Sequence, residues 1–391
     1  MKGTARAEGV VAAGRAIRRD ELLALHREIV ATPSISGEEG ALADLLSARL
    51  LEHGVRAERH GHSLLAVTGD GPVLLLDTHL DTVPPAPGWR RDPFSPTVEE
   101  GRVHGLGSND AKAAVAAMTA AFVALAGEPL PFALGLALVE GEETRGTGTQ
   151  RVLAELAARR RPLLGAVIGE PTGLDVAIAQ KGLLLLELVA RGDACHAAHA
   201  AALGARNAAL LLARDLVTLA GAELAPPHPL LGPTTLQPTV LRAGEARNVV
   251  PGEARAVLDV RTTPEASHAE LTERVRGLVA SEVEVRSERL VPRQTDESSW
   301  LVRAALAARP AARAYGSPTL SDMVYVDGVP AIKVGPGASE RSHTADEWVG
   351  EEEVVAGAAF YVELVRRCAV ELAGTPARAA ASAAANQGSP R

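Results

Sequence analysis

An apolar run that ends in charged residues is the feature that most constrains this chain. Residues 73–76 read Val-Leu-Leu-Leu, and Asp77, His79 and Asp81 follow at every second position. A short, continuous apolar run of this kind is typical of a buried strand. Side chains two positions apart on a strand share a face, so His79 and Asp81 point the same way where the strand ends. The chain therefore gathers ionisable groups at the edge of its core, and these groups require a specific partner.

The same pattern recurs in the segments that follow. Apolar strands are expected at 131–143 and 163–173, each with acidic residues near its end, and a helix rich in small residues is expected at 110–127. Strands that alternate with helices indicate an α/β fold with a mostly parallel sheet. In such sheets, ligands bind outside the carboxyl ends of the strands. The acidic residues expected at this edge are Asp110, Glu142, Glu143 and Glu170.

The segment 34–54 predicts an amphipathic helix with its own start and stop signals. Ser36 and Glu39 have the spacing of a capping box, in which each side chain accepts a hydrogen bond from the other residue's backbone N–H. Gly54 is suited to ending the helix. We therefore expect a capped helix in this segment.

The order of elements changes near Gly182. Residues 182–293 show a strand, a helix, two strands, a helix and a strand, which is the pattern of a ferredoxin-like sandwich. The α/β pattern then resumes to about residue 372, so a small α+β domain is expected to be inserted into a larger α/β domain. The expected bounds are 1–20 for a flexible leader, 21–181 and 294–372 for the larger domain, 182–293 for the inserted domain, and 373–391 for a disordered tail.

The composition excludes several classes of function. The formal net charge is −8 and no basic stripe is present, so a nucleic-acid partner is not expected. No apolar run approaches the roughly 18 residues that a membrane-spanning helix needs, so no membrane partner is expected either. The two cysteines, Cys195 and Cys368, are too few for a disulfide framework or a thiolate metal cage. This cysteine content fits a reducing cytoplasm.

Carboxylates that converge on one sheet edge repel one another, so a cation is expected among them. A single His-x-Asp pair is more often solvated or part of a helix cap, but the repetition of acids at successive strand ends favours a binding site. His343, in the sequence Ser-His-Thr-Ala-Asp-Glu-Trp, adds a second imidazole. Imidazole and carboxylate ligands without thiolate suit zinc, cobalt or manganese. Two histidines with three or four acids match two ions that share a bridging carboxylate.

Five motifs follow one another along the chain: THLDTVP, GLGSNDAK, EGEETRGTG, GEPTG and GPGASERSHTADEW. In this order and spacing they resemble the motifs of the M20 metallopeptidases, a family of di-zinc amidohydrolases, from about residue 21 to residue 370. WRRDPFSPTVEEGRVHGLGSNDA, AIAQKG and GSPTLSDM resemble the acetylornithine deacetylase branch, and KVGPGASERSHTADEW is similar to its acyl-ornithine deacetylases. The family has a catalytic metal-binding domain interrupted by a lid or dimerisation domain, which is the organisation expected above.

The resemblance implies which residues hold the metal. His79 and Glu170 would bind the first ion, and Glu143 and His343 would bind the second. Asp110 would bridge the two ions. We therefore expect two divalent metal ions per subunit, Zn²⁺ or Co²⁺.

The resemblance also implies the residues that act on the reacting groups. Asp81 would orient the first histidine ligand, and Glu142 would be the general base that takes a proton from the attacking water. The peptide bond after Asp110 would be cis. The chain departs from many relatives at two positions, with Gly141 in place of Asp and Ala111 in place of Met, and neither residue replaces a ligand.

One catalytic and two substrate-binding candidates lie in the inserted domain. His196 follows Gly192 by four residues, as the lid histidine of the family does, and would stabilise the oxyanion of the tetrahedral intermediate. His199 is the competing candidate, although its spacing from Gly192 disfavours it. Asn248 and Arg261 stand where relatives contact substrate. The alternative interpretation of Arg261 is a structural ion pair.

Further candidates for substrate contact lie in two later loops. Ser321 and Asp322 would position the substrate, and Gly335 and Gly337 would let the backbone approach the ligand closely. A serine nucleophile is not expected, because no His-Asp pair remains to serve Ser321. A dinucleotide loop in GLGSNDA is disfavoured because no apolar strand leads into it. Thiol catalysis by Cys195 is disfavoured because zinc chemistry already accounts for its neighbours.

Together these residues predict a cytoplasmic, metal-dependent amidohydrolase that removes the acyl group from an N-acyl amino acid. The resemblance favours N-acetyl-L-ornithine, which would give L-ornithine and acetate in arginine biosynthesis. N-succinylornithine, carrier-protein-linked lysine or ornithine, succinyl-diaminopimelate and dipeptides are the alternatives within the same chemistry. A catalytically inactive metal-binding homologue is the alternative from another class, and the presence of Glu142 argues against it. The resemblance also implies a homodimer formed through the inserted domain.

Overall fold

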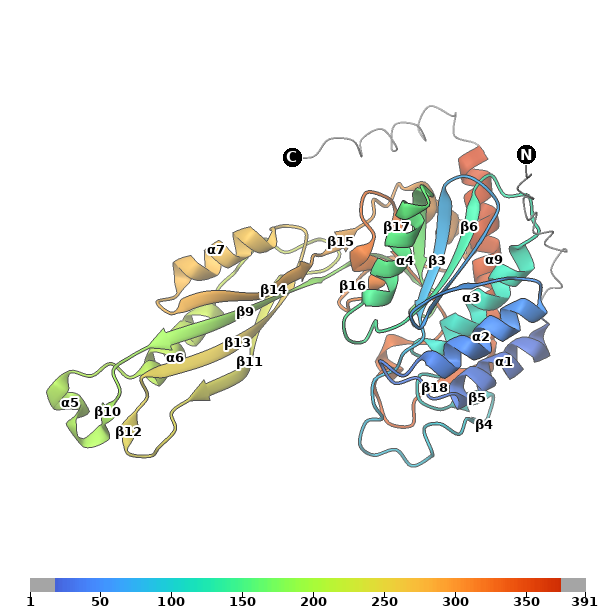
Figure 1. Cartoon of the computed structure of the whole chain (residues 1–391). Coiled ribbons are helices and arrows are strands. Elements are labelled where there is room, and N and C mark those ends of the chain that lie inside the picture. The colour runs from blue at the N-terminus through green and yellow to red at the C-terminus, as the bar shows by residue number, and fades with distance from the viewer. Residues whose placement is uncertain (1–17, 374–391) are drawn as a thin grey trace, which may run out of the picture. The chain divides into compact units, whose positions relative to one another are not determined.

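Two compact units make up residues 18–373, which are the residues that the computed structural model describes (Figure 1). The larger unit contains residues 18–178, 295–315 and 321–373. The inserted unit contains residues 179–294 and 316–320. The sequence predicts an inserted domain at 182–293, without the short second segment.

The segment 316–320 groups with the inserted unit because of close backbone contacts. A Cβ on Gly316 would lie 2.4 Å from the carbonyl oxygen of Leu230, so only glycine fits there. The backbone N–H of Lys181 donates to the carbonyl oxygen of Ser317 at 3.3 Å. These contacts join segments that are far apart in the sequence, so the order of elements along the chain does not reveal them.

The ends of the described chain are helical. α1 (Arg19–Ala31) begins inside the segment that the sequence analysis assigned to a leader, and α9 (Glu351–Ala373) reaches the first residue of the expected tail. The rest of the expected leader and tail, 1–17 and 374–391, lies outside the described residues. Within residues 18–373, no helix has the length and apolar content needed to span a bilayer.

A sheet with a parallel centre organises the larger unit. Its strands lie in the order β1, β2, β6, β3, β7, β17, β8 and β15 (Arg293–Gln294), and β16 (Ala314–Ser317) also pairs with β8. β6, β3, β7 and β17 run parallel to one another, whereas β1, β2 and β8 pair antiparallel at the two sides. This arrangement confirms the predicted α/β fold. The bounds are Glu58–His60 for β1, Ser63–Thr68 for β2, Val73–His79 for β3, Ala133–Val139 for β6, Leu163–Ile168 for β7, Val176–Gln180 for β8 and Ala331–Lys333 for β17.

β3 is buried along its whole length, as its apolar run predicts. Leu74 and Leu76 face a core that includes residues of α1, α2, α3, α8 and α9, whereas Val73 and Leu75 face a second core that includes residues of α4. Figure 1 shows α4 and α3 on opposite sides of the sheet. The bounds of these helices are Gly40–Glu52 for α2, Lys112–Leu125 for α3, Thr147–Ala158 for α4 and Trp300–Ala308 for α8.

A small three-stranded sheet joins two loops that are distant in the sequence. β18 (Trp348–Gly350) pairs antiparallel with β5 (Arg102–His104), which pairs with β4 (Thr97–Glu99). Trp348 lies opposite His104. The pairing places the loop before β18 beside the loop after β5.

The inserted unit is a sandwich of one antiparallel sheet and two helices. The chain runs through β9, α6, β11, β13, α7 and β14, and the strands lie in the order β11, β13, β9, β14. This is the ferredoxin-like arrangement that the sequence predicts. The bounds are Gly182–Arg191 for β9, Ala208–Ala220 for α6, Thr235–Ala243 for β11, Glu253–Thr262 for β13, His268–Leu278 for α7 and Glu282–Leu290 for β14.

Candidate functional site

The carboxyl ends of the central strands carry the predicted site residues. His79 is the last residue of β3, Glu142 and Glu143 follow β6, and Glu170 follows β7. Because β6, β3 and β7 are neighbours in the sheet, these residues come to one edge. Asp110 lies just before α3, and the peptide bond that follows it is cis, which confirms the prediction for that bond.

Two groups of three side chains share Asp110. The first group is His79, Asp110 and Glu170, and the second is Asp110, Glu143 and His343; the ligand atoms of each group lie within 4.8 Å of one another. Asp110 Oδ1 is 3.3 Å from His79 Nε2, and Asp110 Oδ2 is 3.8 Å from His343 Nε2. The two oxygens of one carboxylate therefore face two different histidines, as a bridging ligand requires. The structure brings together all five residues that the sequence analysis expected to bind metal.

Burial among like charges shapes the electrostatics of this edge. Burial raises the pKa of Glu170 to about 8, and the neighbouring Asp110 adds to the rise. Burial, followed by repulsion from Glu170, raises the pKa of Glu142 well above its usual value. Divalent cations would favour the ionised carboxylates. The donor set of imidazole nitrogens and carboxylate oxygens, without thiolate, fits two Zn²⁺ or Co²⁺ ions.

Asp81 holds the turn that carries the two glutamates. Its carboxylate accepts the backbone N–H of Glu142 at 3.0 Å and that of Glu143 at 3.2 Å. His79 Nδ1 lies 2.9 Å from the backbone oxygen of Asp81 and 3.5 Å from its carboxylate. Since a carbonyl oxygen only accepts, Nδ1 carries the proton and Nε2 is left to bind metal. Asp81 therefore contacts His79 mainly through its backbone, and its carboxylate holds the turn that carries Glu142 and Glu143.

The predicted capping box of Ser36 and Glu39 is wrong. α2 begins at Gly40, and neither side chain caps it in the expected way. The Ser36 hydroxyl instead donates to Asp81 Oδ2 at 2.7 Å, and Glu39 Oε1 accepts the backbone N–H of Gly141 at 3.2 Å. Both side chains therefore support the turn after β6, because the buried groups there compete with the local cap for hydrogen bonds.

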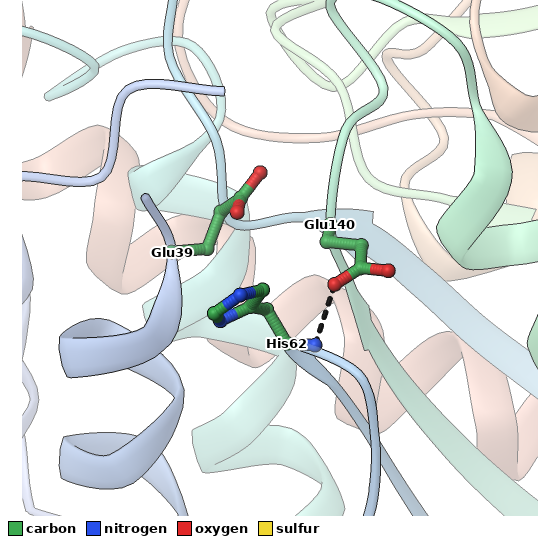
Figure 2. A group of neighbouring side chains, drawn as sticks. All are labelled: Glu39, His62 and Glu140. Carbon is green, nitrogen blue, oxygen red and sulfur yellow. Dashed lines mark hydrogen bonds between the residues drawn. The ribbon is translucent and has the colours of Figure 1, made fainter. Parts of the chain in front are cut away.

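A further group, Glu39, His62 and Glu140, has ligand atoms within 4.8 Å of one another. Figure 2 shows that the carboxylate of Glu39 points away from the His62 ring. Glu140 already forms an ion pair with Arg151 through one oxygen and accepts the backbone N–H of His62 through the other. Arg59 Nη2 lies 3.5 Å from His62 Nδ1. The guanidinium groups of Arg59 and Arg151 lie beside these three side chains and disfavour a bound cation. We therefore assign no metal to Glu39, His62 and Glu140.

Ser321 and Asp322 lie at the start of the short helix η2 (Asp322–Tyr325), and both are buried. Thr149 Oγ1 is 2.6 Å from Asp322 Oδ2 and 3.1 Å from Asp77 Oδ2. Burial raises the pKa of Asp322 to about 6. Asp322 therefore contacts Thr149, which also contacts Asp77 of β3, and the contact of Asp322 with a substrate stays a prediction.

Gly335 and Gly337 allow close backbone contacts within the protein. A Cβ on Gly335 would lie 2.6 Å from the backbone oxygen of Glu170. A Cβ on Gly337, which has a φ of +87°, would lie 2.3 Å from Asn109 Oδ1. The close approach that the structure shows is to the segments that carry Glu170 and Asp110, and the approach to a substrate stays a prediction.

The structure places His196 and Asn248 side by side in the inserted unit. β10 (Cys195–His196) pairs antiparallel with β12 (Val249–Val250), and the backbone N–H of Ala197 donates to the carbonyl oxygen of Asn248 at 2.9 Å. His196 is exposed, and its Nδ1 accepts the backbone N–H of Ala198 at 3.2 Å. A neutral imidazole that accepts at Nδ1 carries its proton on Nε2, so Nε2–H is available as a donor.

Arg261 forms an ion pair on its own strand. Its Nε lies 2.8 Å from Asp259 Oδ1, and its Nη2 lies 3.1 Å from Asp259 Oδ2. The two residues stand two positions apart on β13 and so share a face of the sheet. This geometry matches the structural ion pair that the sequence analysis kept as an alternative, and substrate contact by Arg261 stays a prediction.

Sequence reasoning missed two buried charged residues at this edge. Glu347 accepts hydrogen bonds from the backbone of the loop that carries Asp110, and no spacing rule pointed to it. Lys333 ends β17 and is 2% exposed. Burial lowers the pKa of Lys333, while the charges of Glu170 and Glu142 act against that change. Lysine occurs only at positions 2, 112, 181 and 333, and this rarity is the signal that could have singled out Lys333.

Comparisons with known proteins give a consistent result. A sequence model of peptidase family M20/M25/M40 matches residues 75–367. A succinyl-diaminopimelate desuccinylase of Bordetella petrii is 35% identical over 274 residues, which are 66% of this chain and 72% of that protein. Another, from a Methylobacterium species, is 32% identical over 383 residues, which are 87% of this chain and 94% of that protein. The M20 family metallo-carboxypeptidase of Sulfolobus solfataricus shares the fold, with a TM-score of 0.73 at 19% sequence identity, over 90% of this chain and 100% of that chain.

Proposed function

Because the chain belongs to peptidase family M20/M25/M40, whose members are metal-dependent enzymes that hydrolyse amide bonds, we propose that its substrate is an N-acyl amino acid. N-Succinyl-diaminopimelate is the first candidate, since both relatives described above are named succinyl-diaminopimelate desuccinylase. N-Acetyl-L-ornithine, which the sequence analysis favoured, becomes the second candidate. Hydrolysis would release succinate and diaminopimelate from the first substrate, or acetate and ornithine from the second.

The two ligand groups that share Asp110 are the observation that carries this proposal. His79 and Glu170 would hold the first ion, Glu143 and His343 would hold the second, and Asp110 would contact both. When bound, the ions polarise the amide carbonyl and lower the pKa of the attacking water toward neutrality.

Glu142 supplies the proton transfers. It lies outside both groups that share Asp110, yet its backbone is held beside that of Glu143 by the Asp81 carboxylate. Glu143 Oε1 lies 2.9 Å from His343 Nε2. The Glu142 carboxylate lies within 4.8 Å of ligand atoms of His79 and Glu143, where it would be available to the attacking water. Glu142 takes a proton from the water and gives one to the leaving amine.

A panel of N-acyl amino acids tests the proposal. The metal-free protein is assayed for release of free amine after addition of Zn²⁺, Co²⁺ or buffer alone, with succinyl-diaminopimelate, acetylornithine, succinylornithine and a dipeptide as substrates. We expect hydrolysis only with metal, and the highest kcat/KM with succinyl-diaminopimelate. A higher kcat/KM for acetylornithine would restore the sequence-based choice. No hydrolysis of any amide with either metal would contradict the proposal as a whole.

The inserted unit offers a surface for a second copy of the chain. β11 lies at the edge of its sheet and exposes Val240 and Leu241. α6 packs beside β11 and exposes Leu210 and Val217, which are seven residues apart and so share a helix face. An unpaired strand edge next to exposed apolar side chains is typical of an interface. A symmetric dimer would bury the same surface on both copies.

The dimer is tested with two matched variants. Leu241 on β11 and Leu51 on α2 are each 60% exposed. We expect Leu241→Glu to raise the dimer dissociation constant by more than about tenfold, because a charge in a symmetric interface meets its own copy. Leu51→Glu is expected to leave the dimer unchanged. Sedimentation velocity over a concentration series measures both, and a wild-type protein that stays monomeric at high concentration would rule out the dimer.

Loss of the His196 side chain is expected to lower kcat without loss of metal. His196 lies in the inserted unit, whereas every expected metal ligand lies in the larger unit. Its Nε2–H would donate to the oxyanion, and removal of one such donor typically costs about 10²–10³-fold in kcat. Kinetics and metal analysis of His196→Ala measure the two effects. A variant with wild-type kcat would exclude the role.

Mixed dimers decide whether His196 serves its own subunit or the partner. A Glu142→Gln chain and a His196→Ala chain are combined under conditions of verified subunit exchange. If the histidine acts on the partner's site, each mixed dimer contains one intact site. Random exchange of equal amounts then restores about one quarter of wild-type activity, since half of the dimers are mixed and half of their sites are intact. No recovery would place His196 in its own subunit's site or outside catalysis.

A further inference from the structure

We propose that Glu347 is a positioning residue that fixes Asp110 between the two metal ions. The inference rests on the ligand roles given under the proposed function. Glu347 is 2% exposed and lies four residues after His343. Its carboxylate belongs to neither of the two ligand groups that share Asp110. It instead accepts hydrogen bonds from the backbone of the loop that carries Asp110.

Three backbone N–H groups converge on the Glu347 carboxylate. Oε2 accepts from Gly107 at 2.8 Å, and Oε1 accepts from Asn109 at 3.0 Å and from Asp110 at 2.9 Å. The loop that contains these donors precedes α3 and belongs to no strand. Buried N–H groups outside helices and strands require other acceptors, and a carboxylate provides stronger ones than a neutral group. Glu347 therefore determines the path of the backbone that carries Asp110.

The same residue joins the Asp110 loop to the loop of His343. The backbone oxygen of Glu347 accepts the N–H of Gly105 at 3.0 Å, and the next residue begins β18, which pairs with β5. The backbone of Glu347 is thus hydrogen-bonded to Gly105, just before the Asp110 loop, and its side chain is hydrogen-bonded to residues within that loop. Movement of either loop would change the 3.8 Å distance between Asp110 Oδ2 and His343 Nε2.

Asn109 provides a second connection between these loops. Its Nδ2 donates to the carbonyl oxygen of Ala338 at 3.1 Å and to Ser342 Oγ at 3.3 Å, and its Oδ1 accepts the backbone N–H of Ala338 at 2.9 Å. The Asp110 loop and the His343 loop are therefore held together by protein contacts alone. The second group of ligands is preorganised before a metal arrives, which lowers the cost of binding.

Glu347→Gln tests the role with little change in size. The amide offers one acceptor oxygen and turns an NH₂ group toward at least one of the three N–H donors, so it cannot satisfy all of them. We expect the affinity of the metal-free protein for Co²⁺ to fall by about 10–100-fold, the usual effect of losing a partner that supports metal ligands. Calorimetric titration measures the affinity, and the visible spectrum of bound Co²⁺ reports the changed ligand geometry.

Asp215→Asn is the matched control. Asp215 is a buried carboxylate of the inserted unit that accepts the backbone N–H of Ala280 at 3.1 Å and of Ser281 at 2.8 Å. Its loss removes the same kind of hydrogen bond where no metal ligand lies. We expect a lower melting temperature in both variants but a lower metal affinity only in Glu347→Gln. Equal loss of affinity in both variants would overturn the positioning role, and so would wild-type affinity in Glu347→Gln.

Two further measurements separate this inference from the ligand assignment. If Asp110→Ala still binds both ions, the ligand roles are refuted. If Asp110→Ala loses both ions while Glu347→Gln binds them with wild-type affinity, only the inference about Glu347 is refuted. Hydrogen exchange on the metal-free wild-type protein needs no variant. The amides of Gly107, Asn109 and Asp110 are expected to exchange slowly, because Glu347 accepts them without metal, and fast exchange of all three would contradict the proposal.

Discussion

Glutamine in place of Glu142 is expected to lower kcat by about 10²–10⁴-fold, the usual contribution of a general base, while both metal ions stay bound. The amide has the size of the carboxylate but cannot take a proton from water. Glu142 lies within 4.8 Å of ligand atoms of His79 and Glu143, but it belongs to neither of the groups that share Asp110. The ligand sets assigned under the proposed function therefore remain complete. Steady-state kinetics and metal analysis of the same preparation measure the two quantities.

The adjacent Glu143→Gln variant is the control for this experiment. Glu143 Oε1 lies 2.9 Å from His343 Nε2, within the second group of ligands. We expect this variant to lose the second ion together with its activity. If metal is instead lost from the Glu142 variant and kept in the Glu143 variant, the roles of the two glutamates are reversed.

Alanine in place of Asp110 is expected to weaken the binding of both ions by more than about 100-fold, because loss of a partner outside the ligand set already costs 10–100-fold. Asp110 belongs both to the group with His79 and Glu170 and to the group with Glu143 and His343. Each of its carboxylate oxygens faces a different histidine. Turnover is expected to fall with the metal content. Titration of the metal-free variant with Co²⁺, followed by kinetics at high metal concentration, measures both effects.

His79→Ala and His343→Ala are the matched comparisons for Asp110. Each variant removes one histidine from one of the two groups that share Asp110. Each is therefore expected to weaken the binding of one ion strongly and to leave the binding of the other unchanged. Loss of both ions from Asp110→Ala, with one ion kept in each histidine variant, identifies the bridging ligand. Retention of one tightly bound ion in Asp110→Ala would contradict the bridging role.

Short-range patterns were enough to predict the strands around the site. The apolar run at 73–76 predicted a buried strand, and the structure shows that Val73 and Leu74 face two different cores. The order of helices and strands at 182–293 predicted the ferredoxin-like unit. Both predictions succeed because the period of buried side chains is set by neighbouring residues along the chain.

Ser36 and Glu39 show where short-range reasoning failed. Their spacing matches a capping box, but their partners in the structure are Asp81 and Gly141. A buried carboxylate at the end of a strand takes its donors from whichever segment the fold brings near it. The local sequence contains no sign of that competition.

The sequence by itself determined which side chains stand at the ends of the strands. His79, Glu143 and Glu170 follow apolar runs, and this places imidazole and carboxylate groups at one edge of a parallel sheet. Only the tertiary structure decided that Asp110 lies between two histidines. Glu347, which lies 237 positions from Asp110 along the chain, binds its backbone N–H. Such contacts depend on how β18 pairs with β5 and on the order of strands in the sheet, and these long-range pairings leave no periodic pattern in the sequence.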